Sequence, residues 1–127
     1  MAQSVIAVLP DCSDSAVICD SLGRDGIAVR LVPSPEQALR LLTANADSVI
    51  LYDADTGQPW RDALPRFLTT RPGARVVLLT QFGDHKTWLD LFDAGGFDLL
   101  LRPLQPANLR AVVRCALDPP KFFHAAA

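Results

Sequence analysis

The sequence of 127 residues lacks the features that mark membrane-spanning, secreted or nucleic-acid-binding chains. No apolar run approaches the roughly eighteen residues that a membrane-spanning helix needs, and the first residues lack the basic start of a secretory signal. Positive charge is not in excess, because the net charge is −2. We therefore expect neither nucleic acid nor a membrane among the partners of this chain.

Cysteine, histidine and glycine are also scarce. The three cysteines, Cys12, Cys19 and Cys115, have no metal-site spacing, and an odd count without a secretion signal predicts reduced, buried thiols in the cytoplasm. The two histidines have no neighbours that suggest a catalytic triad or a metal site, and we do not expect an enzyme. No glycine-rich GxGxxG loop follows the first apolar run, which argues against a flavodoxin-like cofactor binder.

What the sequence does contain is a regular alternation of five short apolar runs with stretches of helical period. The runs span residues 5–9, 27–31, 49–52, 76–79 and 97–101. All but the second are almost continuously apolar, which is typical of strands buried on both faces of a parallel sheet. The second contains Arg30, which favours an edge strand. The alternation predicts an α/β fold with a five-stranded, doubly wound parallel sheet.

Helix signals occupy the intervals between these runs, with the first, at about residues 13–22, the weakest. Ser34 followed by Pro35 predicts a capped helix start, whereas Pro65 should kink or shorten the next helix. The stretch 84–94 ends at two glycines, and we expect its Trp88 and Phe92 to be core residues. A last helix is expected over residues 106–117. The whole pattern predicts one domain over residues 1–118 and a loosely held tail or linker remnant over residues 119–127.

Polar side chains follow four of the predicted strands. Asp11 comes after the first, Asp53 and Asp55 after the third, Thr80 after the fourth and Arg102 after the fifth. Because ligands of open parallel sheets bind at the carboxyl ends of the strands, we expect these side chains to meet at one rim. Converging carboxylates favour a hard divalent cation such as Mg²⁺, and a carboxylate beside Mg²⁺ is equipped for phosphoryl transfer.

These motifs resemble the receiver domains of two-component response regulators over residues 4–117. The matching segments are residues 8–11, 49–53, 78–80 and 94–104. The resemblance implies the flavodoxin-like strand order 2-1-3-4-5. It also implies a histidine kinase or phosphotransfer protein as partner, and it leaves homodimerisation open.

Residue by residue, the resemblance assigns Asp53 as the phospho-acceptor. Asp11, Asp53 and Asp55 would hold Mg²⁺, with Asp55 contributing its backbone carbonyl. Thr80 would bond the phosphoryl oxygens and move on activation, and Arg102 takes the place of a lysine. The residues themselves leave other interpretations open: Asp11 as a cap or turn residue, and Arg102 as a salt bridge to Asp53 or Asp11 without catalysis.

Departures from the family pattern concern the metal and the switch. Pro10 replaces the first of two adjacent acids, so we expect Mg²⁺ to bind weakly or not at all. Arg102 keeps the charge of the lysine but not its compact geometry, and Pro103 follows it, often with a cis peptide in the family. Leu99 stands where the family commonly has the aromatic ring that moves with the threonine.

Two functional hypotheses follow from these matches and departures. In the first, Asp53 accepts phosphate with Mg²⁺, and the change is read on the face of the fourth helix, fifth strand and fifth helix. In the second, the domain is a pseudo-receiver, a protein-interaction module that works without phosphorylation.

Overall fold

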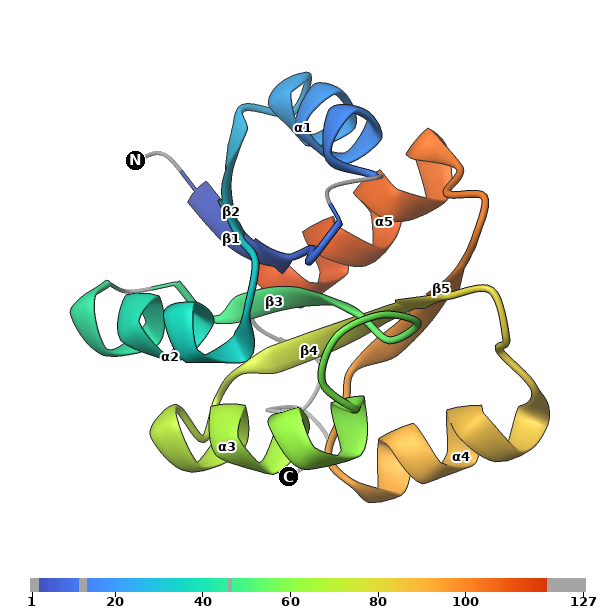
Figure 1. Ribbon diagram of the computed structural model, residues 1–127. Helices are drawn as coiled ribbons and strands as arrows, with labels where there is room; N and C mark the ends of the chain where they lie inside the picture. Colours follow the sequence, from blue (N-terminus) through green and yellow to red (C-terminus); the bar gives the residue numbers. More distant parts are fainter. Residues whose placement is uncertain (1–2, 12–13, 46, 119–127) are drawn as a thin grey trace, which may run out of the picture.

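The computed structural model describes residues 3–11, 14–45 and 47–118 (Figure 1). The elements are β1 (Gln3–Val8), α1 (Ser15–Gly23), β2 (Ile27–Val32), α2 (Pro35–Ala44), β3 (Val49–Asp53), α3 (Trp60–Thr70), β4 (Arg75–Thr80), α4 (His85–Asp93), β5 (Asp98–Leu101) and α5 (Pro106–Leu117). All neighbouring strands are parallel, in the order β2-β1-β3-β4-β5, which confirms the predicted fold class. Among the described residues no helix has the length and apolarity to cross a bilayer.

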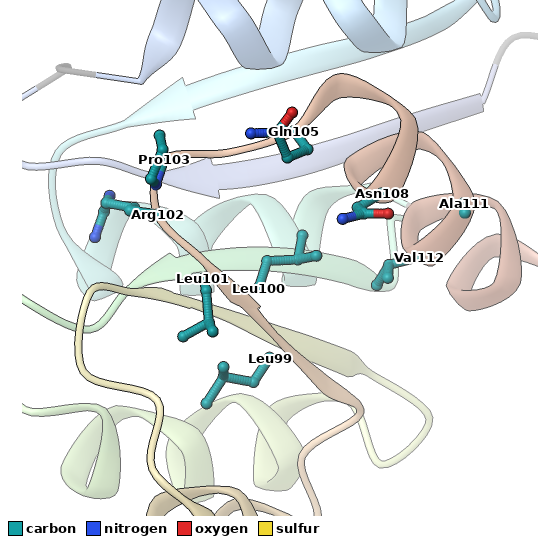
Figure 2. Close-up of a pocket in the computed structure, with 9 residues that line it drawn as sticks. All are labelled: Leu99, Leu100, Leu101, Arg102, Pro103, Gln105, Asn108, Ala111 and Val112. Atoms are coloured by element: carbon teal, nitrogen blue, oxygen red, sulfur yellow. The ribbon is translucent and has the colours of Figure 1, made fainter.

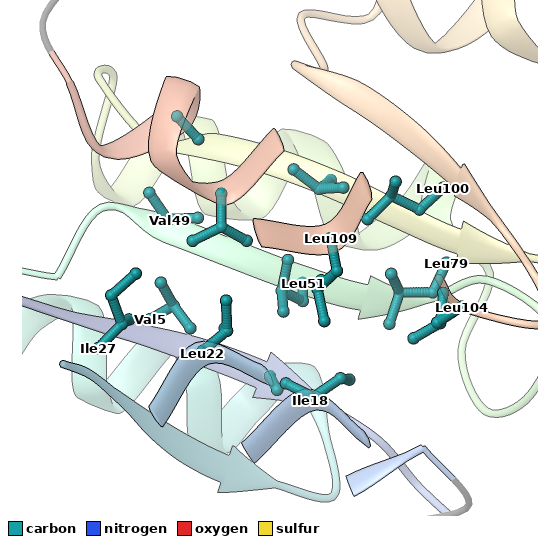
Figure 3. Packing of buried hydrophobic residues seen from close by; sticks show 14 of the residues in the cluster. Val5, Ile18, Leu22, Ile27, Val49, Leu51, Leu79, Leu100, Leu104 and Leu109 are labelled. Atoms are coloured by element: carbon teal, nitrogen blue, oxygen red, sulfur yellow. The ribbon is translucent and has the colours of Figure 1, made fainter. Parts of the chain in front are cut away.

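The sheet lies between two helical layers. Helices α1 and α5 cover one face, and α2, α3 and α4 lie on the other (Figure 1). Strand β3 is buried along its whole length, so its successive side chains serve the two layers in turn: Leu51 packs under α1 and α5 (Figure 3), whereas Ile50 and Tyr52 pack under α2 and α3. Each such side chain contributes about 1.5–3 kcal/mol on burial.

The prediction for one edge of the sheet is confirmed, and the prediction for the other is wrong. Strand β2 is an edge strand, as Arg30 indicated. Strand β5 forms the other edge, so the prediction that the fifth run is buried on both faces was wrong. Leu101 is 53% exposed because no strand lies beyond β5 and α4 leaves this side of it uncovered. An edge strand that ends in three leucines places hydrophobic surface in solvent.

The capping residues predicted the start of helix α2 correctly, whereas the proline inside helix α3 does not end that helix. The Ser34 hydroxyl accepts a hydrogen bond from the Gln37 N–H at 3.4 Å and Pro35 is the first helical residue, as predicted. Pro65 was expected to kink or shorten helix α3, but the helix continues through it from Trp60 to Thr70 and is not shortened there. A proline removes only one hydrogen bond of the ladder, and the buried side chains of α3 hold the helix on the sheet.

Helix α4 turns a different side toward the sheet than its spacing indicated. Leu91 is fully buried, but Trp88 and Phe92 are 41% and 42% exposed, so their assignment to the core was wrong. Their rings instead contact each other edge to face, with centroids 4.5 Å apart. The pair thereby shields part of its own apolar area from solvent.

The cysteines also differ from expectation. Cys19 and Cys115 are exposed thiols on α1 and α5, on the sides of these helices that face away from the sheet. Their predicted burial was therefore wrong. Cys12 and the predicted tail, residues 119–127, lie outside the described residues.

Candidate functional site

The carboxyl ends of β3, β4 and β5 bring four of the predicted site residues together. Asp53 is the last residue of β3 and Thr80 the last of β4, while Arg102 directly follows β5. The strand ladder continues into the loops, since the Arg102 N–H donates to the Thr80 carbonyl at 2.9 Å. Asp55 lies one turn beyond β3 and completes the group.

Arg102 is the centre of this rim, and its side chain is 12% exposed. Its Nε lies 2.6 Å from Asp14 Oδ2, and its Nη1 lies 2.8 Å from Asp55 Oδ2 and 3.2 Å from Asp53 Oδ1. Nη1 also donates to the Leu79 carbonyl at 3.1 Å. We call these four side chains, Asp14, Asp53, Asp55 and Arg102, the Arg102 cluster.

The charge balance of the Arg102 cluster holds the guanidinium in its ionised form. Burial opposes the positive charge of Arg102, but the hydrogen bond to Asp14 and the negative charges of Asp53 and Asp14 outweigh burial and raise the pKa of Arg102. One cation therefore serves three carboxylates, and its position is fixed by the loop after β1 and the end of β3 at once. Such multiple charge-assisted contacts define a single rotamer more strongly than one ion pair does.

Asp55 points its carboxylate inward rather than into solvent. Its Oδ1 accepts a hydrogen bond from the Thr80 hydroxyl at 2.5 Å, and its Oδ2 accepts from the Gln81 N–H and from Arg102 Nη1, each at 2.8 Å. The Thr80 oxygen in turn accepts from the Phe82 N–H at 3.0 Å. Both oxygens of this carboxylate are thus bound by groups on two other loops.

Asp53 is 1% exposed, and its contacts come from its own loop and from Arg102. Its Oδ1 accepts from the Asp55 N–H at 2.9 Å, and its Oδ2 accepts from the Thr56 hydroxyl at 2.6 Å. This pattern is an Asx-type turn, in which an aspartate satisfies the backbone that follows it. The same turn directs the Asp55 side chain toward Thr80.

The loop after β3 is held by two further contacts. Gly57 adopts a φ of +72°, and a Cβ atom there would lie 2.9 Å from the Pro10 side chain, so the Pro10 ring packs directly against this loop. The Tyr52 hydroxyl donates to the Gln58 carbonyl at 2.6 Å. Burial, and next the nearby charge of Glu36, raise the pKa of Tyr52 to about 12, so the hydroxyl remains a donor at neutral pH.

Asp11 and Leu99 are the other two predicted site residues. Asp11 is exposed, and a second acid from the same loop, Asp14, precedes α1 and reaches Arg102. Leu99 is partly buried and packs beneath Gly83, where an added Cβ would lie 2.8 Å from it. Among the described residues no set of three or more His, Cys, Asp or Glu side chains has the geometry to hold a metal ion.

Sequence reasoning missed Asp14, Thr56 and the backbone N–H of Gln81. Asp14 could have been predicted as a site residue. It directly precedes a helix in the loop after the first strand, where it is as well placed as Asp11. Thr56 carried a weaker signal, as a hydroxyl three residues after Asp53. A backbone N–H such as that of Gln81 carries no side-chain signal at all.

A surface pocket of about 450 Å³ opens beside Arg102, on the outer side of β5 (Figure 2). Its lining comes from β5, the following turn and α5: Leu99, Leu100, Leu101, Arg102, Pro103, Gln105, Asn108, Ala111 and Val112. The Arg102–Pro103 peptide bond is cis. Arg102 stands at the end of the pocket away from Val112 (Figure 2), so one residue belongs both to this pocket and to the Arg102 cluster.

Comparison with solved structures identifies the fold. A response regulator from Thermotoga maritima matches with a TM-score of 0.84 and 19% identity, covering 92% of this chain and 98% of that one. A response regulator receiver domain protein from Methanospirillum hungatei matches with a TM-score of 0.81 and 17% identity over 93% and 95%. A two-component response regulator from Clostridium difficile gives 0.81 and 19% over 91% and 95%.

No protein-family model matches the sequence, and no curated protein matches it significantly. At identities of 17–19%, the similarity to these solved structures shows the fold alone. The chain therefore has the fold of response-regulator receiver domains over most of its length.

Proposed function

We propose that this domain is a receiver-type module of two-component signalling that works through protein contacts without being phosphorylated. The observation that carries the proposal is the position of Arg102, whose Nη1 contacts Asp53 and Asp55 at once. A guanidinium in that place is a permanent counter-charge for these carboxylates. A phosphoryl group entering at Asp53 would have to compete with contacts that are already made.

The donor set at this rim fits Mg²⁺ poorly. Mg²⁺ requires oxygen ligands in near-ideal octahedral geometry and keeps several waters. Here Arg102 Nη1 contacts the carboxylates of both Asp53 and Asp55, where the metal would have to bind. The ring of Pro10, which has no metal-binding group, packs against the same loop at Gly57. We infer that the arginine replaces the divalent cation as the counter-charge, so no step of the proposed function depends on the metal.

The surface through which the module would act is the side of α4, β5 and α5. Exposed apolar side chains lie on α4, on β5 and on the loop before α4: Phe82, Trp88, Leu89, Phe92 and Leu101. The pocket beside Arg102 opens on the same strand. A patch of exposed hydrophobic residues is typical of a protein-binding surface, and a partner protein or a second copy of the chain is the expected occupant.

Intact mass after treatment with acetyl phosphate and MgCl₂ tests the proposal. We expect no phosphate adduct on the wild-type chain, because both Asp53 oxygens and the phosphoryl-binding donors are engaged. A receiver domain that is readily phosphorylated under the same conditions serves as the positive control. The double variant Pro10→Asp, Arg102→Lys, which restores an acid and a compact cation, should take up more phosphate than the wild type.

The second candidate is phosphorylation of Asp53 by a histidine kinase or phosphotransfer protein. The observation in its favour is the grouping of Asp53, Thr80 and Arg102 at one rim. A wild-type adduct that disappears in Asp53→Asn would establish this candidate and end the first. An adduct that persists in Asp53→Asn would place the modification elsewhere and support neither role for Asp53.

A further inference from the structure

The strongest unexplained feature of the rim is the inward direction of the Asp55 carboxylate. Three donors converge on it from two loops: the Thr80 hydroxyl at 2.5 Å, the Gln81 N–H at 2.8 Å and Arg102 Nη1 at 2.8 Å. A hydroxyl, a backbone N–H and a guanidinium are the groups that proteins use to bind an oxyanion. We call these three groups the donor cradle.

The donor cradle is adjacent to Asp53, because Arg102 Nη1 contacts the carboxylates of Asp53 and Asp55 together. Any oxyanion carried on Asp53 would therefore need the same donors that Asp55 now holds. The Asp55 side chain is 10% exposed, and both of its oxygens have partners. Its carboxylate thus stands where an external anion would find its hydrogen bonds.

We propose that Asp55 is an internal anion that fills the donor cradle in place of a phosphoryl group. It holds Thr80 in the anion-bound arrangement at all times, and Thr80 in turn positions the loop before α4 by accepting from the Phe82 N–H at 3.0 Å. The domain is then fixed in one signalling state by its own side chain. This inference rests on the proposed function, in which the domain works without phosphorylation.

The chain itself supplies the reason why Asp55 is able to reach the cradle. Its own N–H donates to Asp53 Oδ1 at 2.9 Å, and the Thr56 hydroxyl donates to Asp53 Oδ2 at 2.6 Å, so the turn is closed around Asp53. A closed turn fixes the direction of the next side chain, and the cation of Arg102 compensates for placing the two carboxylates side by side. The carboxylate is held in place before any ligand arrives.

A phosphate titration followed by NMR tests the internal anion. In Asp55→Ala the cradle is empty, so inorganic phosphate should shift the amide signals of Thr80, Gln81 and Phe82 with saturation, at an affinity about tenfold or more above the wild type. The wild type and Asp93→Ala, which removes an exposed carboxylate from α4, should both show the weaker binding at these amides. Sodium chloride at matched ionic strength controls for screening.

Two results would overturn the inference: a wild type that binds phosphate at the Thr80 and Gln81 amides as tightly as the variant, or a folded Asp55→Ala that does not bind it there. A second measurement requires no variant. The Gln81 amide should exchange slowly with solvent in the wild type although Gln81 is exposed, because it donates to Asp55. Rapid exchange would show that the carboxylate does not occupy the cradle.

The outcome is separable from that of the proposed function. A phosphate adduct on wild-type Asp53 would contradict the phosphorylation-independent role. The phosphate titration of Asp55→Ala would still report whether the donor cradle binds an anion once the carboxylate is removed. Absence of an adduct together with no phosphate binding in Asp55→Ala would instead keep the pseudo-receiver role and remove Asp55 as its cause.

Discussion

Two clusters in this fold pair arginine with aspartate, and their charge ratios are opposite. In the Arg102 cluster one guanidinium serves three carboxylates. Between the loop after α1 and helix α5, one carboxylate, Asp25, is paired with two guanidinium groups, Arg110 and Arg114. The first cluster lies at the carboxyl ends of the strands, whereas the second joins two elements on one side of the sheet.

The difference separates a structural contact from a candidate site. Arg110 places Nε and Nη2 on the two oxygens of Asp25 at 3.0 and 2.8 Å, a matched fork in which each group finds its partner. The Arg102 cluster has an excess of negative charge, and Arg102 Nη2 is buried without a hydrogen-bond partner among the described residues. A mismatch of this kind costs stability, so its presence favours a functional explanation over a structural one.

The largest expected effect is that of Arg102→Met. Removal of the guanidinium leaves the Arg102 cluster with three carboxylates and no cation, and one of them, Asp53, is fully buried. We expect the free energy of unfolding to fall by about 3 kcal/mol, near the lower end for a broken buried ion pair because the rim reaches the surface. Urea unfolding monitored by circular dichroism measures it.

The matched control is Arg110→Met, which removes an arginine of the same chemical type from the other cluster. Its loss should be smaller, because Asp25 keeps Arg114 as a partner and the Arg110 side chain is more exposed than that of Arg102. Equal losses in the two variants would show that the charge ratio does not distinguish the clusters, and the functional interpretation of the mismatch would lose its basis.

A smaller effect is expected from Thr80→Val, which removes the hydroxyl but keeps the volume of the side chain. Thr80 is buried, so the change leaves the Phe82 N–H and one Asp55 oxygen without their partner, at a cost of about 1–3 kcal/mol in unfolding free energy. Thr43→Val is the matched control, since the Thr43 hydroxyl is exposed and donates only to the Arg40 carbonyl. It should change stability by less than about 0.5 kcal/mol.

The sequence predicted the fold well because the signals that set it are local and repeated. Each buried strand is a short apolar run, and Ser34 with Pro35 begins α2 as predicted. The errors concern edges and surfaces. The run of β5 is nearly as apolar as that of β3, yet the position of β5 at the end of the sheet leaves Leu101 exposed. Trp88 was misplaced because α4 buries Leu91 and not Trp88.

The candidate site was predictable in outline but not in its contacts. Strand topology alone brings Asp53, Thr80 and Arg102 to one rim, because parallel strands end on the same side. Whether Asp11 or Asp14 reaches Arg102 depends on the path of one loop, which leaves no periodic signal in the sequence. The inward turn of Asp55 depends on the hydrogen bond from its own backbone N–H to the Asp53 carboxylate, and a backbone donor leaves no side-chain signal in the sequence.

The subtlest prediction concerns the pH dependence of the Asp25 pair. The hydrogen bond from Arg110, opposed by burial, lowers the pKa of Asp25 below its ordinary value of 3.8. Because the folded value lies below the unfolded one, the stabilisation is complete above the unfolded pKa and is lost as pH falls through the folded one. The difference in unfolding free energy between the wild type and Asp25→Asn should therefore shrink as pH falls from about 5 to below the ordinary value of 3.8.

Urea titrations of both proteins across that range measure the difference, with Asp93→Asn as the control for removing an exposed carboxylate. A difference that stays constant across the range would mean that Asp25 stabilises the fold through the shape of its contacts and not through its charge. In that case the matched fork of Asp25 and Arg110 would be a packing contact, and its contrast with the Arg102 cluster would rest on hydrogen bonding alone.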